Sequence, residues 1–231
     1  MKPQPTVLKV LNVVSGVLLL ASLGMVFFYA PMEATMGYVQ KIFYFHIATA
    51  WVGMLGFLVA AAAGVIYLVR QDLKWDIAEL AAVEISLVFF LAAILAGSIW
   101  ARPTWGTWWT WDPRLTTAAI LEMIYVACLL LRQGIEDTDR RARFSAVYTL
   151  VGALSVPITF LSIRLFRTIH PAVIGTGSAS SLGGFDISSK MLVTMFFALI
   201  AFSVIFVTLF WHRVRLGQLA QHVEERKLEM M

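Results

Sequence analysis

The sequence predicts an all-α, polytopic membrane protein with six transmembrane helices and both termini in the cytoplasm. Hydrophobic residues make up 60% of the 231 residues, and charged residues make up only 14%. Soluble domains are about 45–50% apolar and about 25% charged, so this chain has too few charges to cover a soluble surface. The apolar stretches are long and continuous, whereas a transmembrane β-barrel has segments of about 10 residues with alternating hydrophobicity. The composition also excludes a disordered chain, and the single cysteine, Cys128, excludes a disulfide-stapled scaffold.

Six stretches are long enough to cross a bilayer, whose hydrocarbon core of about 30 Å requires about 20 helical residues. We expect these spans near residues 10–30, 42–69, 78–101, 115–131, 144–163 and 191–211. The first stretch is longer than the roughly 7–15 apolar residues of a signal-peptide core, so we interpret it as a retained helix. The connecting segments are too short for a second domain. We therefore expect one transmembrane domain over residues 1–231.

The distribution of positive charge predicts the orientation, because Lys and Arg favour the cytoplasmic side of a membrane. With both termini inside, the inner segments carry 12 of the 18 Lys and Arg residues and the outer segments carry 6. This orientation places the tail 212–231 in the cytoplasm and the loop 102–116 outside. The net charge of +4 reflects the same bias, so we expect contact with membrane lipid and no nucleic-acid partner.

The outer loop 102–116 is rich in tryptophan and reads RPTWGTWWTWDPRLT. Four of the eight tryptophans fall within seven residues of this loop, namely Trp105, Trp108, Trp109 and Trp111. One interpretation is an aromatic belt at the lipid headgroups, but such belts spread one or two tryptophans over each helix end. A flat apolar platform for a large planar ligand fits the clustering better, since indoles offer a large contact area at low entropic cost.

Two histidines are predicted on the same side of the membrane as the tryptophans. His46 lies near the outer end of the second span, and His170 lies in the last outer loop. Each histidine alone can be a tolerated interfacial residue, but together they can ligate haem iron from opposite sides of a planar macrocycle. A tetrahedral zinc site is less favoured, because no third histidine, cysteine or paired carboxylate accompanies them outside.

Four arginines lie near the outer ends of the third, fourth and fifth spans, against the general charge bias. They are Arg102, Arg114, Arg164 and Arg167. Arginine binds carboxylates through a bidentate fork, and haem carries two propionates, so these side chains are candidate haem contacts. A membrane anchor or an ion pair with Asp112 is the alternative for each.

The segment from Trp105 to Thr116, WGTWWTWDPRLT, resembles the tryptophan-rich signature of the haem-handling proteins of cytochrome c biogenesis, known as the WWD domain. Its Arg-Leu-Thr ending resembles the haem exporter protein C family in particular, and the resemblance extends over essentially the whole chain. It implies that His46 and His170 are axial haem ligands. It also implies that the haem contacts include Trp105, Trp108, Trp109, Trp111 and Asp112.

The resemblance further implies a function and a set of partners. The protein would bind haem b without a covalent bond at the extracytoplasmic face of a bacterial-type inner membrane and deliver it to a periplasmic haem chaperone. Its other partners would be the ATPase and permease subunits of an ABC-type complex and a small single-span membrane subunit. The sequence contains no G-x-x-x-x-G-K-[ST] loop and no C-x-x-C-H motif, which agrees with a non-enzymatic subunit that is not itself a c-type cytochrome.

Two other function classes remain as alternatives to a haem-delivery subunit. One is a haem lyase, which joins haem to apocytochrome thiols, and the other is a haem-independent membrane scaffold or small-molecule permease. The short loops and the Arg-Leu-Thr ending favour delivery over the lyase. For a delivery subunit, we expect the tryptophan loop to form part of the chaperone docking surface, with Asp112 and Arg114 at its polar rim.

Overall fold

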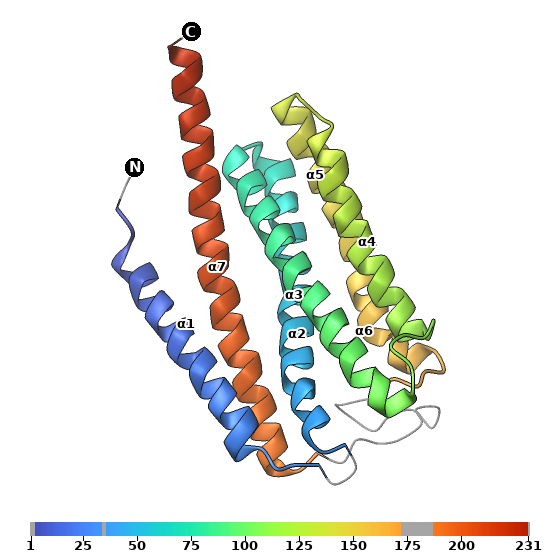
Figure 1. The fold of residues 1–231 in the computed structure, drawn as a ribbon. Helices are drawn as coiled ribbons and strands as arrows, with labels where there is room; N and C mark the ends of the chain where they lie inside the picture. The colour runs from blue at the N-terminus through green and yellow to red at the C-terminus, as the bar shows by residue number, and fades with distance from the viewer. Residues whose placement is uncertain (1–2, 34–35, 172–186, 231) are drawn as a thin grey trace.

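The computed structural model describes residues 3–33, 36–171 and 187–230, which form a bundle of long helices (Figure 1). In chain order the α-helices are α1 (Thr6–Gly24), α2 (Ile42–Arg70), α3 (Leu73–Trp105), α4 (Pro113–Gln133), α5 (Thr138–Ala153), α6 (Ser155–Leu165) and α7 (Ser189–Glu229). A π-helical segment, Met25–Tyr29, extends α1, and a 3-10 turn, Tyr38–Lys41, precedes α2. The only β structure in the described residues is an isolated bridge between Glu33 and Gly37. The all-α prediction is confirmed.

Six segments of the described chain are long and apolar enough to cross a membrane. They are Thr6–Tyr29, Tyr38–Arg70, Leu73–Trp105, Pro113–Gln133, Thr138–Leu165 and Ser189–Glu229. The prediction of a six-span polytopic membrane protein is therefore confirmed. An even number of spans returns the chain to the side on which it began, and both termini lie at the same end of the bundle (Figure 1).

The helices differ from the predicted spans mainly at their ends. The third span is longer than residues 78–101, because the Asp72 side chain caps its first turn and Gly106, with a φ of 75°, ends it. The predicted loop 102–116 is consequently reduced to residues 106–112. The expected tail 212–231 continues α7 as a helix up to Glu229.

The fifth span consists of two helices, α5 and α6, which meet at Leu154. Pro157 has no backbone N–H and therefore cannot bond the carbonyl of Ala153, four residues earlier. Proline is a known cause of such breaks in helices. Helix α6 continues to the end of the bundle where the tryptophan loop lies (Figure 1).

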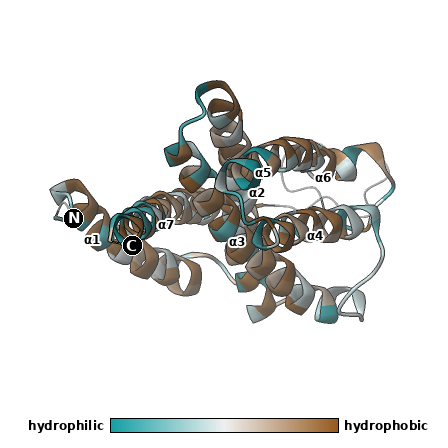
Figure 2. Ribbon diagram, turned by 90° about the horizontal axis from the view of Figure 1, so that it is seen from above, coloured by the Kyte–Doolittle hydropathy of each residue, from teal (hydrophilic) through white to brown (hydrophobic). Residues whose placement is uncertain are grey.

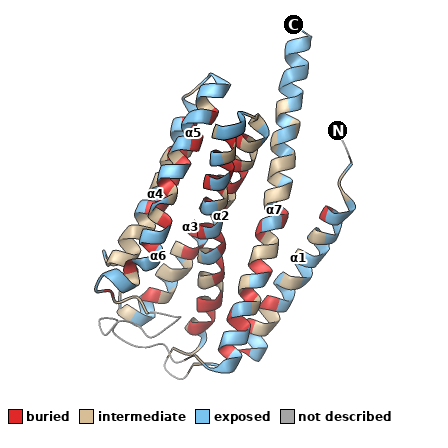
Figure 3. Cartoon of the chain, turned by 180° about the vertical axis from the view of Figure 1, so that it is seen from behind, coloured by how far each residue is buried: buried red, intermediate tan, exposed pale blue. Residues whose placement is uncertain are grey.

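Helices α2 and α3 form the centre of the bundle. Helix α2 contacts α3, α5 and α7, while α4 packs on α5 and α6 at one side and α1 packs on α7 at the other. Close approach of α2 to α3 depends on glycine, since a Cβ added to Gly53 would lie 2.8 Å from Phe90 Cβ. Hydrophobic residues predominate along most of the helices (Figure 2), and many large ones are exposed, such as Val13 of α1 and Val88 of α3. Exposed residues line much of α1 and the last turns of α7 (Figure 3).

Polar pairs join the helices at the end of the bundle nearest the termini. Arg132 of α4 donates two hydrogen bonds of 2.6 and 2.5 Å to the carboxylate of Asp76 on α3, and both side chains are buried. Arg213 of α7 pairs with Glu84 of α3, with 2.9 Å between Arg213 Nη2 and Glu84 Oε1. These pairs join α4 and α7 to α3. A cavity lies at the opposite end of the bundle.

Candidate functional site

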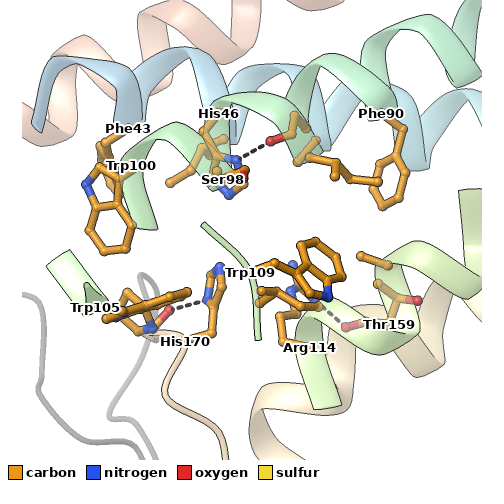
Figure 4. A pocket seen from close by; sticks show the side chains of 18 residues that line it. Phe43, His46, Phe90, Ser98, Trp100, Trp105, Trp109, Arg114, Thr159 and His170 are labelled. Carbon is orange, nitrogen blue, oxygen red and sulfur yellow. Dashed lines mark hydrogen bonds between the residues drawn. The ribbon is translucent and has the colours of Figure 1, made fainter. Parts of the chain in front are cut away.

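His46 and His170 face each other across a cavity (Figure 4). The cavity lies between the beginning of α2 and the end of α3, and these helix ends are opposite the termini (Figure 1). His46 lies in the second turn of α2, and His170 lies in the segment that follows α6. Their ring centroids are 6.2 Å apart, and the ring planes meet at 40°. The structure thus brings together the two histidines that the sequence places 124 residues apart.

Each histidine uses its Nδ1 atom to bind a backbone carbonyl. His46 Nδ1 lies 2.8 Å from the carbonyl oxygen of Ala93, and His170 Nδ1 lies 3.1 Å from that of Pro171. A carbonyl oxygen only accepts hydrogen bonds, so each Nδ1 carries the proton and each Nε2 carries the lone pair. Metal-ligating histidines are oriented in this way, with the second nitrogen donating to a carbonyl or carboxylate.

The electrostatic surroundings keep His170 neutral. Burial, followed by the nearby positive charge of Arg114 and the neighbouring His46, lowers the pKa of His170 to about 3. A neutral imidazole is the form that binds a metal. His170 can therefore act as a ligand throughout the physiological pH range.

The separation of the two rings matches a bis-histidine metal centre. An imidazole nitrogen lies about 2 Å from a bound metal and its ring centre about 1 Å further away, so two imidazoles on one metal have centroids about 6 Å apart. The observed centroid distance of 6.2 Å fits this value. The described residues contain no group of three or more His, Cys, Asp or Glu that could hold a bare metal ion. The separation of the two imidazoles thus fits a metal centre with two protein ligands.

The cavity around the histidines has an empty volume of about 860 Å³, part of which is open to solvent. The wall is mainly apolar and includes Phe43 and Ile47 of α2 and Phe90 and Ile94 of α3. The cavity therefore offers an apolar ligand a large contact surface beside the two imidazoles (Figure 4).

The tryptophans divide into two groups. Trp105 and Trp109 line the cavity together with Trp100, which the sequence analysis did not include among the site residues. Trp105 lies edge-to-face with both Trp100 and His170, at centroid distances of 5.6 and 6.3 Å. Trp108 and Trp111 are not part of the wall and are 55% and 76% exposed. Half of the predicted tryptophans thus face the cavity and half face outward.

Among the four predicted arginines, only Arg114 lines the cavity. It begins α4 beside Pro113, and its guanidinium donates to the carbonyl of Thr159 on α6. Arg102 is exposed and donates to the carbonyl of Gly106, at the end of α3. Arg164 and Arg167 are exposed and lie outside the wall. The side chain of Asp112 is also outside the wall and caps α4 by accepting a hydrogen bond of 2.9 Å from the Arg114 backbone.

Sequence reasoning did not identify the small residues on α3 that support His46. A Cβ added to Gly97 would lie 2.8 Å from His46 Cε1, so the imidazole packs directly on the glycine backbone. One turn earlier, Ala93 supplies the carbonyl that binds His46 Nδ1. Small residues four positions apart in an apolar span are a sequence signal for close helix contact, but they do not indicate which side chain makes the contact.

Fold and site together define a class: a six-span helical membrane protein with a histidine pair in a tryptophan-lined cavity at one end of the bundle. A family model described as Heme exporter protein C matches residues 2–229. The chain belongs to the Heme exporter protein C family. The resemblance noted from the tryptophan-rich loop is confirmed.

Individual relatives support this assignment. The chain is 36% identical over 202 residues to Heme exporter protein C of Bradyrhizobium diazoefficiens. The aligned residues cover 87% of this chain and 74% of the relative. It is 30% identical over 195 residues to the protein of that name from Haemophilus influenzae, covering 84% of this chain and 77% of the relative. For Heme exporter protein C of Escherichia coli K12, identity is 33% over 144 residues, with 62% of this chain and 59% of the relative covered.

Proposed function

We propose that this protein binds haem b between His46 and His170 and delivers it to a periplasmic haem chaperone for c-type cytochrome biogenesis. The observation that carries the proposal is the centroid distance of 6.2 Å between two imidazoles whose Nδ1 atoms are both bound to carbonyls. Haem is the cargo of the protein in this proposal. The names of the relatives, Heme exporter protein C, support the same cargo.

Each part of the cavity wall has a role in this proposal. The two Nε2 atoms approach the iron from opposite sides, which fixes the position and orientation of the ring. The indoles of Trp100, Trp105 and Trp109 contact the macrocycle, and such aromatic contacts contribute about 0.5–1.5 kcal/mol each beyond area burial. Arg114 is the arginine placed to bind a propionate, because its guanidinium lies on the cavity wall.

The proposed orientation places the cavity on the periplasmic side of the inner membrane. The cavity lies at the end opposite the termini, and 12 of the 18 Lys and Arg residues belong to the segments assigned to the cytoplasm. The sequence has no phosphate-binding loop, so the ATPase and permease subunits of the ABC-type complex and the small single-span subunit are proposed as separate chains. The protein itself has a binding role and no enzymatic one.

Haem delivery requires a surface for the chaperone beside the cavity, and we assign it to the outward part of the tryptophan loop. Trp108 and Trp111 are 55% and 76% exposed, whereas Trp109 lines the cavity. Trp111→Ala is expected to weaken co-purification with the chaperone at unchanged haem content, and Trp109→Ala is expected to lower haem content. Full chaperone association of Trp111→Ala would show that the exposed indoles anchor the loop in lipid instead.

The proposed binding is tested by the Soret absorbance of the protein purified from haem-replete membranes. The double variant His46→Gly/His170→Gly is expected to lose the absorbance. The matched control is His212→Gly/His222→Gly, which removes two exposed histidines from the other end of the molecule and is expected to keep it. Equal Soret absorbance in the two double variants would contradict the proposal. Covalent attachment of haem to an apocytochrome by this protein alone would assign it to the lyase class.

A further inference from the structure

We propose that Asp112 is a positioning residue that holds His170 in place and is not itself a haem contact. This inference rests on the proposed function, because it concerns one of the two proposed ligands. Asp112 lies at the end of the tryptophan loop, and its side chain reaches the segment that carries His170. The sequence resemblance assigns this aspartate to haem contact, so the structure gives it a different role.

The carboxylate of Asp112 makes hydrogen bonds to two parts of the chain. Its Oδ1 atom accepts from the Arg114 backbone at 2.9 Å and from the Thr168 hydroxyl at 2.6 Å. Its Oδ2 atom accepts from the Ile169 backbone N–H at 2.9 Å. Because both oxygens are engaged, the carboxylate connects the start of α4 to the two residues that precede His170.

The connection continues to His170 itself. The Thr168 hydroxyl, which donates to Asp112, accepts a hydrogen bond of 3.0 Å from the His170 backbone N–H. Thr168 is buried, with 4% of its surface exposed, so water competes little for these bonds. Asp112, Thr168 and His170 thus form a chain of hydrogen bonds, which we call the Asp112 latch.

The position of His170 makes such a latch necessary. His46 is held within a long helix, whereas His170 lies after the last residue of α6, Leu165, in a segment without regular structure. A residue in an irregular segment depends on specific contacts for its position, and ligand geometry in turn depends on the groups that support the ligand. Trp105 supplies the apolar contact to the His170 ring, and the latch fixes the backbone.

Electrostatics favour this role over haem contact. The haem propionates are carboxylates, and a second carboxylate in contact with them is repelled. The side chain of Asp112 is also absent from the cavity wall, whereas Arg114, two residues later, is part of it. The Trp-Asp-Pro-Arg segment therefore separates two tasks: the aspartate holds the histidine segment and the arginine faces the cavity.

The test compares variants that remove the latch with a variant that removes an equivalent helix cap elsewhere. Asp112→Ala removes all three acceptor contacts, Asp112→Asn keeps one acceptor oxygen, and Thr168→Val removes the hydroxyl at nearly constant volume. The control is Asp137→Ala, because Asp137 caps α5 by accepting from the Arg140 backbone at 2.7 Å and lies at the other end of the bundle. It separates the latch from a general loss of helix capping.

Hydrogen exchange of the Ile169 amide in the haem-free protein tests the latch without any ligand. We expect faster exchange in Asp112→Ala than in the unaltered protein and an unchanged rate in Asp137→Ala. Unchanged exchange in Asp112→Ala would contradict the latch. This readout remains valid even if the protein does not bind haem, so the latch and the proposed function can fail separately.

The spectrum of the ferric haem complex tests the positioning role. We expect Asp112→Ala and Thr168→Val to shift haem from the six-coordinate low-spin form to the five-coordinate high-spin form. For Asp112→Asn we expect a smaller high-spin fraction than in these two variants and a larger one than in the unaltered protein. Loss of such supporting contacts typically lowers metal affinity about 10–100-fold, and we expect a loss of this size for haem. Added imidazole should restore the low-spin form. A low-spin Asp112→Ala complex with full affinity would overturn the inference.

Discussion

His46 depends for its position on two small residues of α3. The carbonyl of Ala93 binds its Nδ1 atom, and Gly97 leaves the space that the imidazole ring occupies. His170 depends instead on Asp112 and on the Trp105 ring. The two proposed ligands therefore have different kinds of support: one is fixed by helix packing and the other by hydrogen bonds to an irregular segment. Substitutions next to each histidine are expected to act through this support.

Gly97→Ala is expected to displace the His46 ring, because the new Cβ would lie 2.8 Å from His46 Cε1 and the side chain can move more easily than the α3 backbone. The helix remains intact, since alanine favours helix over glycine. We expect haem affinity to fall about 10–100-fold, as is typical when the support of a metal ligand is lost. Haem titration measures this change. The control is Gly16→Ala, whose Cβ would have no neighbour within 4 Å, and an equal effect of both variants would contradict the explanation.

From the sequence we could predict that the two histidines and the cluster of tryptophans lie at the same end of the bundle. Residue type and the count of spans suffice for this prediction. It did not allow prediction of which arginine lines the cavity. Arg102, Arg114, Arg164 and Arg167 all lie near the same end, but the path of the loops decides that only Arg114 reaches the wall. The sequence also did not indicate which tryptophans face the cavity. Trp108 and Trp109 are adjacent, yet Trp109 lines the cavity and Trp108 is exposed.

At the scale of the helices, the number of spans could be predicted from continuous apolar length, whereas their ends could not. Hydropathy marks only the part of a helix that lies within the membrane. The helix α7 continues through a polar sequence to Glu229, and α3 extends at both ends to a capping residue, Asp72, and a terminating one, Gly106. The division of the fifth span lies beside Pro157, a residue type that the sequence alone marks as a point where a helix bends or breaks.

The buried pair of Asp76 and Arg132 joins α3 to α4, and its loss is expected to destabilise the bundle. Arg132→Met leaves the Asp76 carboxylate buried and unpaired, which costs about 3–5 kcal/mol. The matched control is Lys74→Met, which breaks a pair with Asp72 whose side chains are 56% and 43% exposed, and such pairs contribute about 0–1 kcal/mol. The measurement is the free energy of unfolding by denaturant in detergent micelles. Equal losses in the two variants would contradict a structural role for the buried pair.

At the scale of the whole molecule, the polar pairs and the ligand cavity lie at opposite ends of the bundle. The Asp76–Arg132 and Glu84–Arg213 pairs tie the helices together toward the termini, and the histidines and tryptophans line the opening at the other end. In the orientation that we propose from the charge count, the first end lies in the cytoplasm and the second in the periplasm. In that proposed orientation, a soluble partner outside the membrane could reach the cavity.

Reporter fusions test this orientation. A fusion at Trp109, in the loop beside the cavity, is expected to report a periplasmic location, and a fusion at Asp137, between α4 and α5, a cytoplasmic one. The two positions are separated by one span, α4, so opposite signals are required by the fold. A cytoplasmic signal at Trp109 with a periplasmic signal at Asp137 would reverse the proposed orientation.

The measurement that tests the central claim most directly is the spin state of ferric haem bound to the purified protein and to its single histidine variants. Two neutral imidazoles on one iron produce a six-coordinate low-spin centre, which we predict for the unaltered protein. His46→Gly and His170→Gly are each predicted to produce a five-coordinate high-spin centre, and added imidazole is predicted to restore the low-spin spectrum in both. A low-spin spectrum that persists in either single variant without added imidazole would contradict the assignment of His46 and His170 as the two axial ligands.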